Sequence, residues 1–394
     1  MKVLNVYISF IYTFYIQLTY ITSENIYNPT TKQLSLSIHE ASINIYKTIP
    51  FLTLIEVEPV KINQYNMPAI TMSLGTPPQT FEFLLTTFSS KLYISEHDDG
   101  FNCNASSTCI DQQTIINLAF ISSTSKGKLL KDTLHLGTTQ LPNFNFIQII
   151  DDTVEYIYKG MIGFDYLSKG SDRDIKNTLD YSLLSQLYVK GIINEQIFSI
   201  GKVDNETKII FGGTPGKPKD INNKTYKTCD LIQRQEDGNV NSLWKCKLNA
   251  VYFEDGKFIQ MDDNEEIAFG ITNAFSSVSK SFFDFLIETY FQNAIDRGIC
   301  NINNDGASQT VWCMPEFGNM QIEDMHFVIG KWSLRIPKEK LWIKRGNFNE
   351  RIFCLMYYPQ KKYTWSINYH LIENEYALVF DRTNDKFGLL KYKE

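Results

Sequence analysis

The stretch YNMPAITMSLGTPPQTFEFLLTTFSSKLYI, residues 65–94, contains three strand-like runs joined by two polar turns. In AITMSL and TFEFLL, apolar and polar residues alternate, which is typical of strands that bury one face. The Gly-Thr-Pro-Pro-Gln segment between these runs predicts a tight turn. A second polar segment, Thr86–Ser90, leads into the third run, KLYI. We therefore expect a strand–turn–strand unit here, followed by a further strand.

The length and composition of the chain limit the classes of protein to which it can belong. Its 394 residues are enough for two domains with substantial cores. With 43% hydrophobic and 21% charged residues, the chain is typical of globular proteins. The formal net charge of -6 and the lack of a dense Lys/Arg block argue against nucleic acid as a partner. No Cys/His spacing resembles a zinc site, so we expect neither a metal nor a cofactor.

The N-terminal segment, residues 1–23, carries one charge, Lys2, before the first acidic residue, Glu24. Small polar residues, Thr22 and Ser23, stand where processing could occur, so the segment predicts a secretory signal peptide. A signal anchor is an alternative because the uncharged run is about as long as a bilayer span, and a buried strand or helix is another. We expect a secreted protein or one in the secretory pathway or vacuolar lumen, with membrane anchoring through this segment as the alternative.

The seven cysteines fit a secreted protein in which some of them pair. A short loop, a hairpin and a longer loop could be closed by Cys103 with Cys109, Cys229 with Cys246, and Cys313 with Cys354. Cys300 would then be left over. Three Asn-x-Ser/Thr sequons give weaker support for a glycosylated chain, at Asn104, Asn205 and Asn223.

Short β-type runs separated by turn signals extend along most of the chain. Helical patterning is limited to residues 182–193 and 280–298, where apolar residues recur at three- and four-residue spacing. Gly, Pro, Asn and Lys concentrate in residues 211–225, which predicts a boundary between two halves. We expect an all-β protein made of an N-terminal extension and two domains, at residues 24–56, 57–213 and 214–394.

One short pattern occurs in both halves. FEFLLTTFSS, residues 81–90, and IAFGITNAFSS, residues 267–277, each run from an apolar strand through a polar turn to Phe-Ser-Ser. A second Phe-Ser-Ser could arise by chance. When the two segments are aligned on it, Thr86 corresponds to Asn273.

At these residues the chain resembles the pepsin-like aspartic peptidases, and the resemblance extends from about residue 57 to the C-terminus. Residues 65–83 are similar to the family's first strands and its Gly-Thr-Pro-Pro-Gln turn. YKGMIGFDYLS, residues 158–168, resembles the family's hydrophobic-hydrophobic-Gly segment. Residues 182–213 are similar to its helix and Gly-Gly strand, and residues 363–392 to its closing segment. Several such motifs in the right order are a specific signal.

The resemblance implies a monomeric, all-β, bilobal acid protease fold, with two β-barrel-like lobes flanking a cleft and few short helices. Each lobe of the family contributes an Asp-Thr-Gly turn, and the two carboxylates share one proton. One carboxylate activates water while the other polarises the scissile carbonyl. The family's disulfides imply the pairs Cys103–Cys109 and Cys313–Cys354. Residues 24–56 lie where the family has an activation segment, and residues 33–46 could still pair with the body as a strand.

Both catalytic positions lack a carboxylate in this chain. Thr86 stands at the first Asp position and Asn273 at the second, and neither is a useful general base. Phe88 and Phe275 replace the turn glycines, so aromatic rings must fit where the backbone should approach the reacting centre. The other turn residues are Thr87, Ser89, Ala274 and Ser276.

Other motifs of the family's active centre are changed as well. In the flap, Phe120 stands at the tyrosine position, and Ile121 and Ser123 stand at glycine positions. Ile367-Asn368-Tyr369 replaces the family's Leu-Gly-Asp. The carboxylates nearest in sequence lie about ten residues from the turns, which is roughly 30 Å of extended chain, and are expected to be solvated charges: Asp98, Asp99, Asp262 and Asp263.

We therefore expect a secreted pseudopeptidase whose cleft, floored by Phe88 and Phe275, binds extended peptide segments without cleaving them. The first alternative is a secreted structural or surface protein with a closed cleft. A second alternative is an active aspartic endopeptidase with an atypical site.

Overall fold

The strand–turn–strand unit predicted at residues 65–94 forms β5 (Pro68–Leu74) and β6 (Gln79–Thr86), which pair antiparallel. The computed structural model describes residues 26–28, 33–35, 55–56, 61–62 and 68–392. Within the last range, the description leaves out residues 88, 97–99, 120–123, 151–159, 166–180, 204–205, 215–225, 233–234, 237–238, 241–243, 263–264, 272–274, 305, 307, 316–321, 345–349 and 360–364.

The chain divides into two compact units, residues 1–51 and 52–394. In the first unit, β1 (Ile26–Asn28) pairs with β2 (Gln33–Ser35), so the described part of the run predicted to join the body pairs within the extension. The predicted signal peptide lies outside the described residues. In the described part of the chain, no helix is long and apolar enough to cross a membrane.

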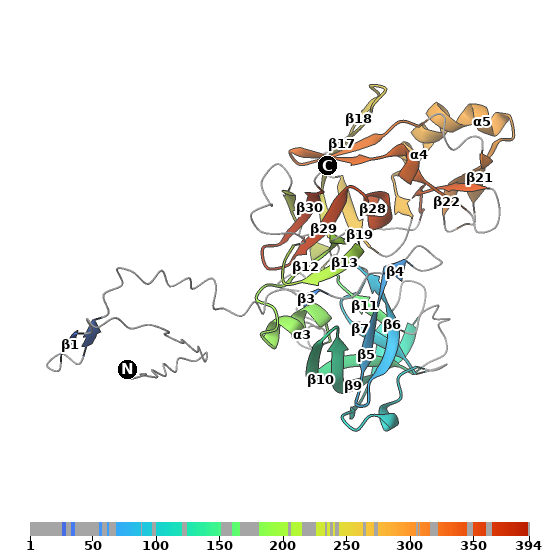
Figure 1. Cartoon of the computed structure of the whole chain (residues 1–394). Coiled ribbons are helices and arrows are strands. Elements are labelled where there is room, and N and C mark those ends of the chain that lie inside the picture. Colours follow the sequence, from blue (N-terminus) through green and yellow to red (C-terminus); the bar gives the residue numbers. More distant parts are fainter. Residues whose placement is uncertain are drawn as a thin grey trace. The chain divides into compact units, whose positions relative to one another are not determined.

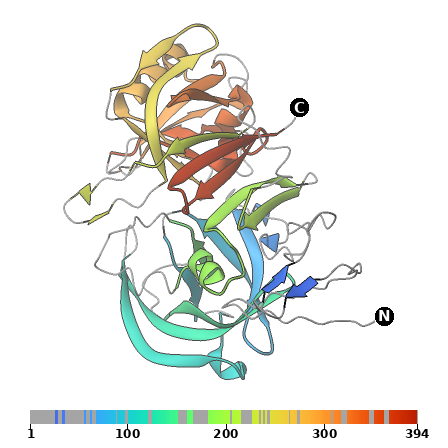
Figure 2. The same ribbon diagram turned by 90° about the vertical axis from the view of Figure 1, so that its left-hand side faces the viewer.

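The first half of the large unit forms a sheet that closes on itself. Its strand order is β4-β5-β6-β11-β7-β10-β9-β8, and β5 also pairs with β9, so six strands form a ring. The alternating side chains of this ring bury Phe83, Phe146 and Ile162 completely. Figure 2 shows the long β8–β9 hairpin curving along this half. The remaining bounds are β4 (Lys61–Ile62), β7 (Leu92–Ser95), β8 (Ile110–Ala119), β9 (Thr124–Leu136), β10 (Thr139–Ile149) and β11 (Gly160–Gly163).

Strands from both halves share a second sheet. Figure 1 shows β12 and β13, in green, close to β29 and β30, in red, and the strand order is β14-β30-β29-β12-β13-β3. Phe198 of the first half stacks on Phe380 of the second, with ring centroids 4.4 Å apart. The two halves therefore depend on each other for part of their core. The bounds are β3 (Ile55–Glu56), β12 (Ile197–Val203), β13 (Glu206–Phe211), β14 (Tyr226–Asp230), β29 (Tyr376–Asp381) and β30 (Lys386–Lys391).

The second half contains three further groups of strands. One sheet has the order β24-β23-β17-β19-β28, with β18 paired to β17, a second has the order β21-β22-β26-β25, and β20 pairs with β27. Their bounds are β17 (Lys245–Phe253), β18 (Phe258–Gln260), β19 (Glu266–Gly270), β20 (Ser276–Ser277), β21 (Cys300–Asn304), β22 (Gln309–Cys313), β23 (Met325–Ile329), β24 (Trp332–Ile336), β25 (Trp342–Lys344), β26 (Arg351–Phe353), β27 (Leu355–Met356) and β28 (Trp365–Asn368). A short pair, β15 (Gln235–Glu236) and β16 (Asn239–Val240), stands apart.

Helices occur where the sequence predicts them, and the first helix of each predicted segment begins at a serine cap. Ser182 accepts a hydrogen bond from Ser185 N at the start of α3 (Leu183–Val189). Ser279 does the same for Phe282 N at the start of α4 (Lys280–Leu286). A π-helical turn, η3 (Ile287–Phe291), and α5 (Gln292–Asp296) continue α4, and 3-10 turns cover Cys103–Ala105, Lys338–Leu341 and Tyr369–Leu371. The prediction of an all-β fold with few short helices is confirmed.

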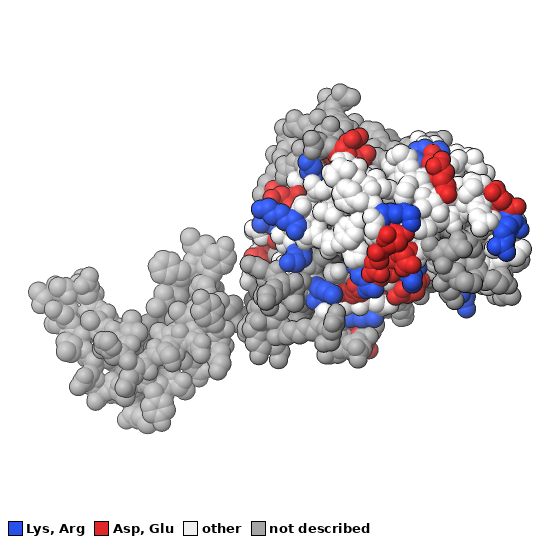
Figure 3. All heavy atoms as spheres, turned by 90° about the horizontal axis from the view of Figure 1, so that it is seen from above, with Lys and Arg blue, Asp and Glu red and all other residues white. Residues whose placement is uncertain are grey.

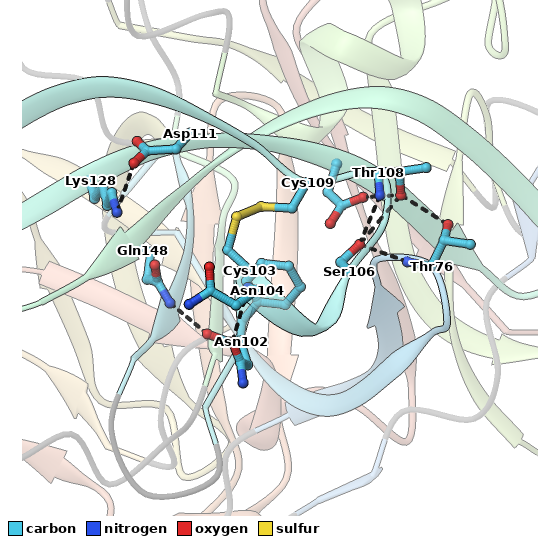
Figure 4. Close-up of a disulfide and its surroundings, with 12 residues drawn as sticks. Thr76, Asn102, Cys103, Asn104, Ser106, Thr108, Cys109, Asp111, Lys128 and Gln148 are labelled. Carbon is cyan, nitrogen blue, oxygen red and sulfur yellow. Dashed lines mark hydrogen bonds and ion pairs between the residues drawn. A yellow bond between two sulfur atoms is a disulfide. The ribbon is translucent and has the colours of Figure 1, made fainter.

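Two predicted disulfides are confirmed and the third is wrong. Cys103 pairs with Cys109, as Figure 4 shows, and Cys229 pairs with Cys246. Cys300 pairs with Cys313, and the Cys354 thiol is free and buried. The reason is the register of the β21–β22 hairpin, which places Cys300 directly opposite Cys313. The prediction of a Cys313–Cys354 bridge did not consider Cys300 as the partner of Cys313.

Charges are mixed on the surface. On the face seen in Figure 3, acidic and basic side chains lie next to one another, with no extended field of one sign. Arg335, for example, pairs with both Asp324 and Glu375.

Candidate functional site

A parallel strand pair ends at the first predicted catalytic position. β11 runs parallel to β6, and its last residue, Gly163, lies opposite Thr86. Phe164 N then donates to Thr86 O at 2.7 Å. A Cβ on Gly163 would lie within 3.0 Å of the Ser89 carbonyl and 2.7 Å from Lys91 N, so only glycine fits here. We call this parallel strand pair the first ladder. The side chain at its end must therefore come from Thr86.

The second half contains a matching ladder. β28 runs parallel to β19, and its last residue, Asn368, lies opposite Gly270. After each ladder the chain makes a turn of the same length: β7 begins at Leu92, six residues after Thr86, and β20 begins at Ser276, six residues after Gly270. Each of these strands then pairs in parallel with another strand, β7 with β10 and β20 with β27. The structure thus makes Gly270 the counterpart of Thr86, and Asn368 the counterpart of Gly163.

The two ladder ends meet. A Cβ on Gly270 would lie 3.3 Å from Thr87 Oγ1 of the first half and within 3.0 Å of Asn368 Oδ1. Thr86, Thr87 and Asn368 are 2%, 1% and 3% exposed, so the meeting point is buried. We call these four residues, Thr86, Thr87, Gly270 and Asn368, the central cluster.

Hydrogen bonds from neighbouring serines hold the second ladder end in place. Asn368 N donates to Ser276 Oγ at 2.9 Å, and Asn368 Nδ2 donates to Phe275 O. Ser277 N donates to Ser366 Oγ at 2.9 Å, and the two hydroxyls are 2.8 Å apart. The strand β20 is therefore tied to β28 through side chains as well as through packing.

The comparisons with known proteins agree with this architecture. A family model described as eukaryotic aspartyl protease matches residues 67–392. The chain belongs to the eukaryotic aspartyl protease family. Pepsin A-5 of Mus musculus is 27% identical over 344 residues, covering 81% of this chain and 79% of the mouse protein. Vacuolar protease A of Arthroderma otae is 22% identical over 238 residues, covering 55% of each chain.

A solved structure shows the same fold at lower sequence identity. The aspartic proteinase from Irpex lacteus superposes with a TM-score of 0.64 at 13% identity, covering 86% of this chain and 98% of that one. At this identity the similarity is evidence for the fold alone. Together with the family match, it confirms the pepsin-like fold expected from the sequence.

In this member of the aspartyl protease family, the ladder of the second half ends at Gly270, three residues before Asn273, the residue predicted at the second Asp position. Asn273 and Ala274 themselves lie outside the described residues, as does Phe88.

The central cluster has a neutral, hydrogen-bonding chemistry. Its members are two threonines, a glycine and an asparagine, none of which ionises near neutral pH. Ser89 is also neutral, and its Oγ donates to Tyr93 Oη at 3.0 Å. Family catalysis needs two carboxylates that share a proton, because one must act as the base and the other as the acid.

The structure describes few of the other predicted site residues. Phe275 is half-buried, while the flap residues Phe120, Ile121 and Ser123 lie outside the described part of the chain. Of the four nearest aspartates, Asp262 is described, and it is exposed. Asn104 is exposed, as a glycosylated residue would be, whereas Asn205 and Asn223 are not described.

No metal cluster lies at the central cluster in the described residues. Among those residues there is no group of three or more His, Cys, Asp or Glu side chains that could hold a metal ion. A pocket of about 270 Å³ lies elsewhere, between β10 and α3, and is lined by Asn143, Asn145, Ser185, Gln186, Tyr188, Val189, Lys190 and Gln196.

Proposed function

We propose that this protein is a catalytically inactive member of the eukaryotic aspartyl protease family that binds extended peptide segments without cleaving them. The observation that carries the proposal is the pair of residues at the two ladder ends, Thr86 and Gly270. Without a carboxylate at either position, the centre has no base for water and no acid for the scissile carbonyl.

Two observations support a location in the secretory pathway or the vacuolar lumen. Three disulfides join six of the seven cysteines, and such bonds persist in oxidising compartments. The relatives include proteins named as vacuolar proteases and a pepsin. The predicted signal peptide at residues 1–23 would deliver the chain there.

The edge strand β8 supports peptide binding. It ends the order of the eight-stranded sheet, and edge strands pair with extended peptides through main-chain hydrogen bonds. Its one charged residue, Asp111, is paired with Lys128 at 2.9 Å. Ile115 is 62% exposed and offers an apolar contact to a partner strand.

A structural or surface protein with a closed cleft is the second candidate. The burial of Thr86, Thr87 and Asn368 favours it, because a ligand would not reach their polar atoms without movement of the surrounding chain. In that case the outer surface, and not the cleft, would carry the function.

The test is incubation of the purified secreted protein with a random peptide library between pH 3 and 7. A matched variant restores the family residues at both ladder ends by Thr86→Asp, Phe88→Gly, Gly270→Asp and Thr272→Gly, with Asn273→Asp in place of Gly270→Asp as a control for the register. We expect no cleavage by the natural chain and retention of a subset of peptides. Cleavage by the natural chain would refute the proposal, and neither cleavage nor retention would favour the structural candidate.

A further inference from the structure

The two ladders of the central cluster carry glycine on opposite sides. In the first ladder, β6 ends with Thr86, which has a side chain, and β11 ends opposite it with Gly163. In the second ladder, β19 ends with Gly270, and β28 ends opposite it with Asn368, which has a side chain. At the second ladder end the side chain therefore comes from the neighbouring strand, β28.

The Asn368 side chain occupies the space that a side chain on Gly270 would need. A Cβ on Gly270 would fall within 3.0 Å of Asn368 Oδ1, a distance that real Cβ atoms essentially never show. The carboxamide is not free to swing away, because Nδ2 donates to Phe275 O and the backbone N–H donates to Ser276 Oγ. Asn368 is also 3% exposed, so solvent does not compete for these bonds.

We propose that Asn368 acts as a built-in plug of the centre. Its carboxamide fills the place of the second carboxylate with a group that does not accept a proton near neutral pH. This inference rests on the proposed loss of catalysis and gives it a steric cause. Restoring carboxylates at positions 86 and 270 will not restore the centre while Asn368 remains.

The first ladder provides the contrast that makes the plug testable. At Gly163 a new Cβ would meet backbone atoms of Ser89 and Lys91, which cannot move without unfolding the turn. At Gly270 the obstacle is one side chain, which a substitution can remove. The cost of adding a Cβ at position 270 must therefore depend on the residue at position 368, whereas the cost at position 163 must not.

A double-mutant cycle on the full secreted chain tests the steric part. We expect Gly270→Ala alone to lower the thermal unfolding midpoint by ~3 °C or more, and to lower it by much less when combined with Asn368→Gly. Gly163→Ala should lower the midpoint equally with and without Asn368→Gly. Asn301→Gly, at an exposed strand position, controls for the backbone effect of glycine. Additive effects of Gly270→Ala and Asn368→Gly would overturn the plug.

Binding of a transition-state analogue tests the functional part. The probe is a peptide that contains a hydroxyethylene group in place of the scissile amide, measured by calorimetry at pH 4 and pH 7. The fourfold restoring variant of the preceding section should bind it at least ~100-fold more tightly with Asn368→Gly than without it. Equal affinity in the two backgrounds would overturn the plug. Cleavage by the natural chain would refute the proposed function and leave the outcome of the thermal cycle unaffected.

Discussion

At the scale of single residues, glycine decides which strand of a ladder can carry a side chain. At the end of the first ladder, a Cβ on Gly163 would meet the Ser89 carbonyl and Lys91 N. The neighbouring Thr86 then supplies the side chain at the centre. Since backbone atoms cannot move aside, position 163 cannot accept a larger residue without a change in the backbone.

We expect Gly163→Ala to destabilise the protein by about 3 kcal/mol or more, because overpacking against backbone cannot be relieved by a rotamer change. Urea unfolding followed by tryptophan fluorescence measures the loss. Gly306→Ala is the control: nothing lies within 4 Å of a Cβ there, so the cost is only that of the left-handed backbone, about 1–2 kcal/mol. Equal losses in the two variants would contradict the steric explanation.

Burial of a histidine gives the protein a defined response to acid. Burial lowers the pKa of His370, Glu373 opposes this shift by raising it, and Lys340 lowers it further. An unfolded chain, with an ordinary histidine pKa of about 6.5, therefore binds a proton at a higher pH than the native protein does. Native stability from this group is complete above that pH and falls as the pH drops towards the lower native pKa.

We accordingly expect the unfolding free energy to decrease between pH 7 and pH 5, and to decrease less in His370→Gln. Chemical denaturation at a series of pH values measures the difference. His135→Gln serves as the comparison for replacing a histidine, at a ring whose Nε2 lies 2.9 Å from Gly75 O. An unchanged slope in His370→Gln would show that the pKa of His370 is the same in the native and the unfolded protein.

The free thiol provides a check on the disulfide pattern. Burial raises the pKa of Cys354 well above its usual range, so the native protein should not react with a maleimide reagent at pH 7. Denaturation without reductant should expose one reactive thiol per chain. A tryptic peptide linking Cys300 to Cys313 should appear in mass spectra, and a peptide linking Cys313 to Cys354 would contradict the observed pairing.

At the scale of elements, the edge strand β8 carries the proposed contact with peptides. It is ten residues long, and Ile115 points its side chain into solvent. A charge at the edge of a sheet discourages the addition of another strand.

We expect Ile115→Lys to weaken the retention of library peptides by about tenfold, which corresponds to ~1.4 kcal/mol. Ile302→Lys is the matched control, since Ile302 is an exposed isoleucine on β21 of the other half. Fluorescence polarisation with a retained peptide measures both affinities. Equal affinities in the two variants would place the peptide elsewhere.

At the scale of the whole large unit, the two halves are joined by shared structure. β12 of the first half pairs with β29 of the second, and Trp244 Nε1 donates to Phe164 O at 2.7 Å across the halves. Trp244 and Phe198 both pack on Phe380. Neither half contains a complete core of its own at this contact.

We therefore expect residues 57–213 and 214–394, expressed separately, to lack a sharp unfolding transition, and residues 52–394 to unfold in one. Differential scanning calorimetry distinguishes these cases. Co-expression of the two fragments should recover a sharp transition if the shared sheet forms from separate chains. A sharp transition in either isolated fragment would show that the shared sheet is dispensable.

Local patterns in the sequence determined much of the fold. The alternation of residues in β5 and β6 and the turn between them predicted a strand pair, and Ser182 and Ser279 stand at the helix starts. The lack of a carboxylate at Thr86 was also readable directly, because this residue follows an unambiguous strand. These features depend on the conformational preferences of residues that are neighbours in the sequence, so the sequence alone predicts them.

Only the tertiary structure decided which residues face one another across the molecule. The partner of Cys313 and the residue opposite Asn368 are set by strand register, which the hydrogen bonds between the paired strands establish. The repeat of Phe-Ser-Ser gave no sign that Gly270 lies opposite Asn368, whose side chain fills the space beside this glycine. A local repeat contains no information about that space, since the side chain that fills it comes from a strand almost a hundred residues away.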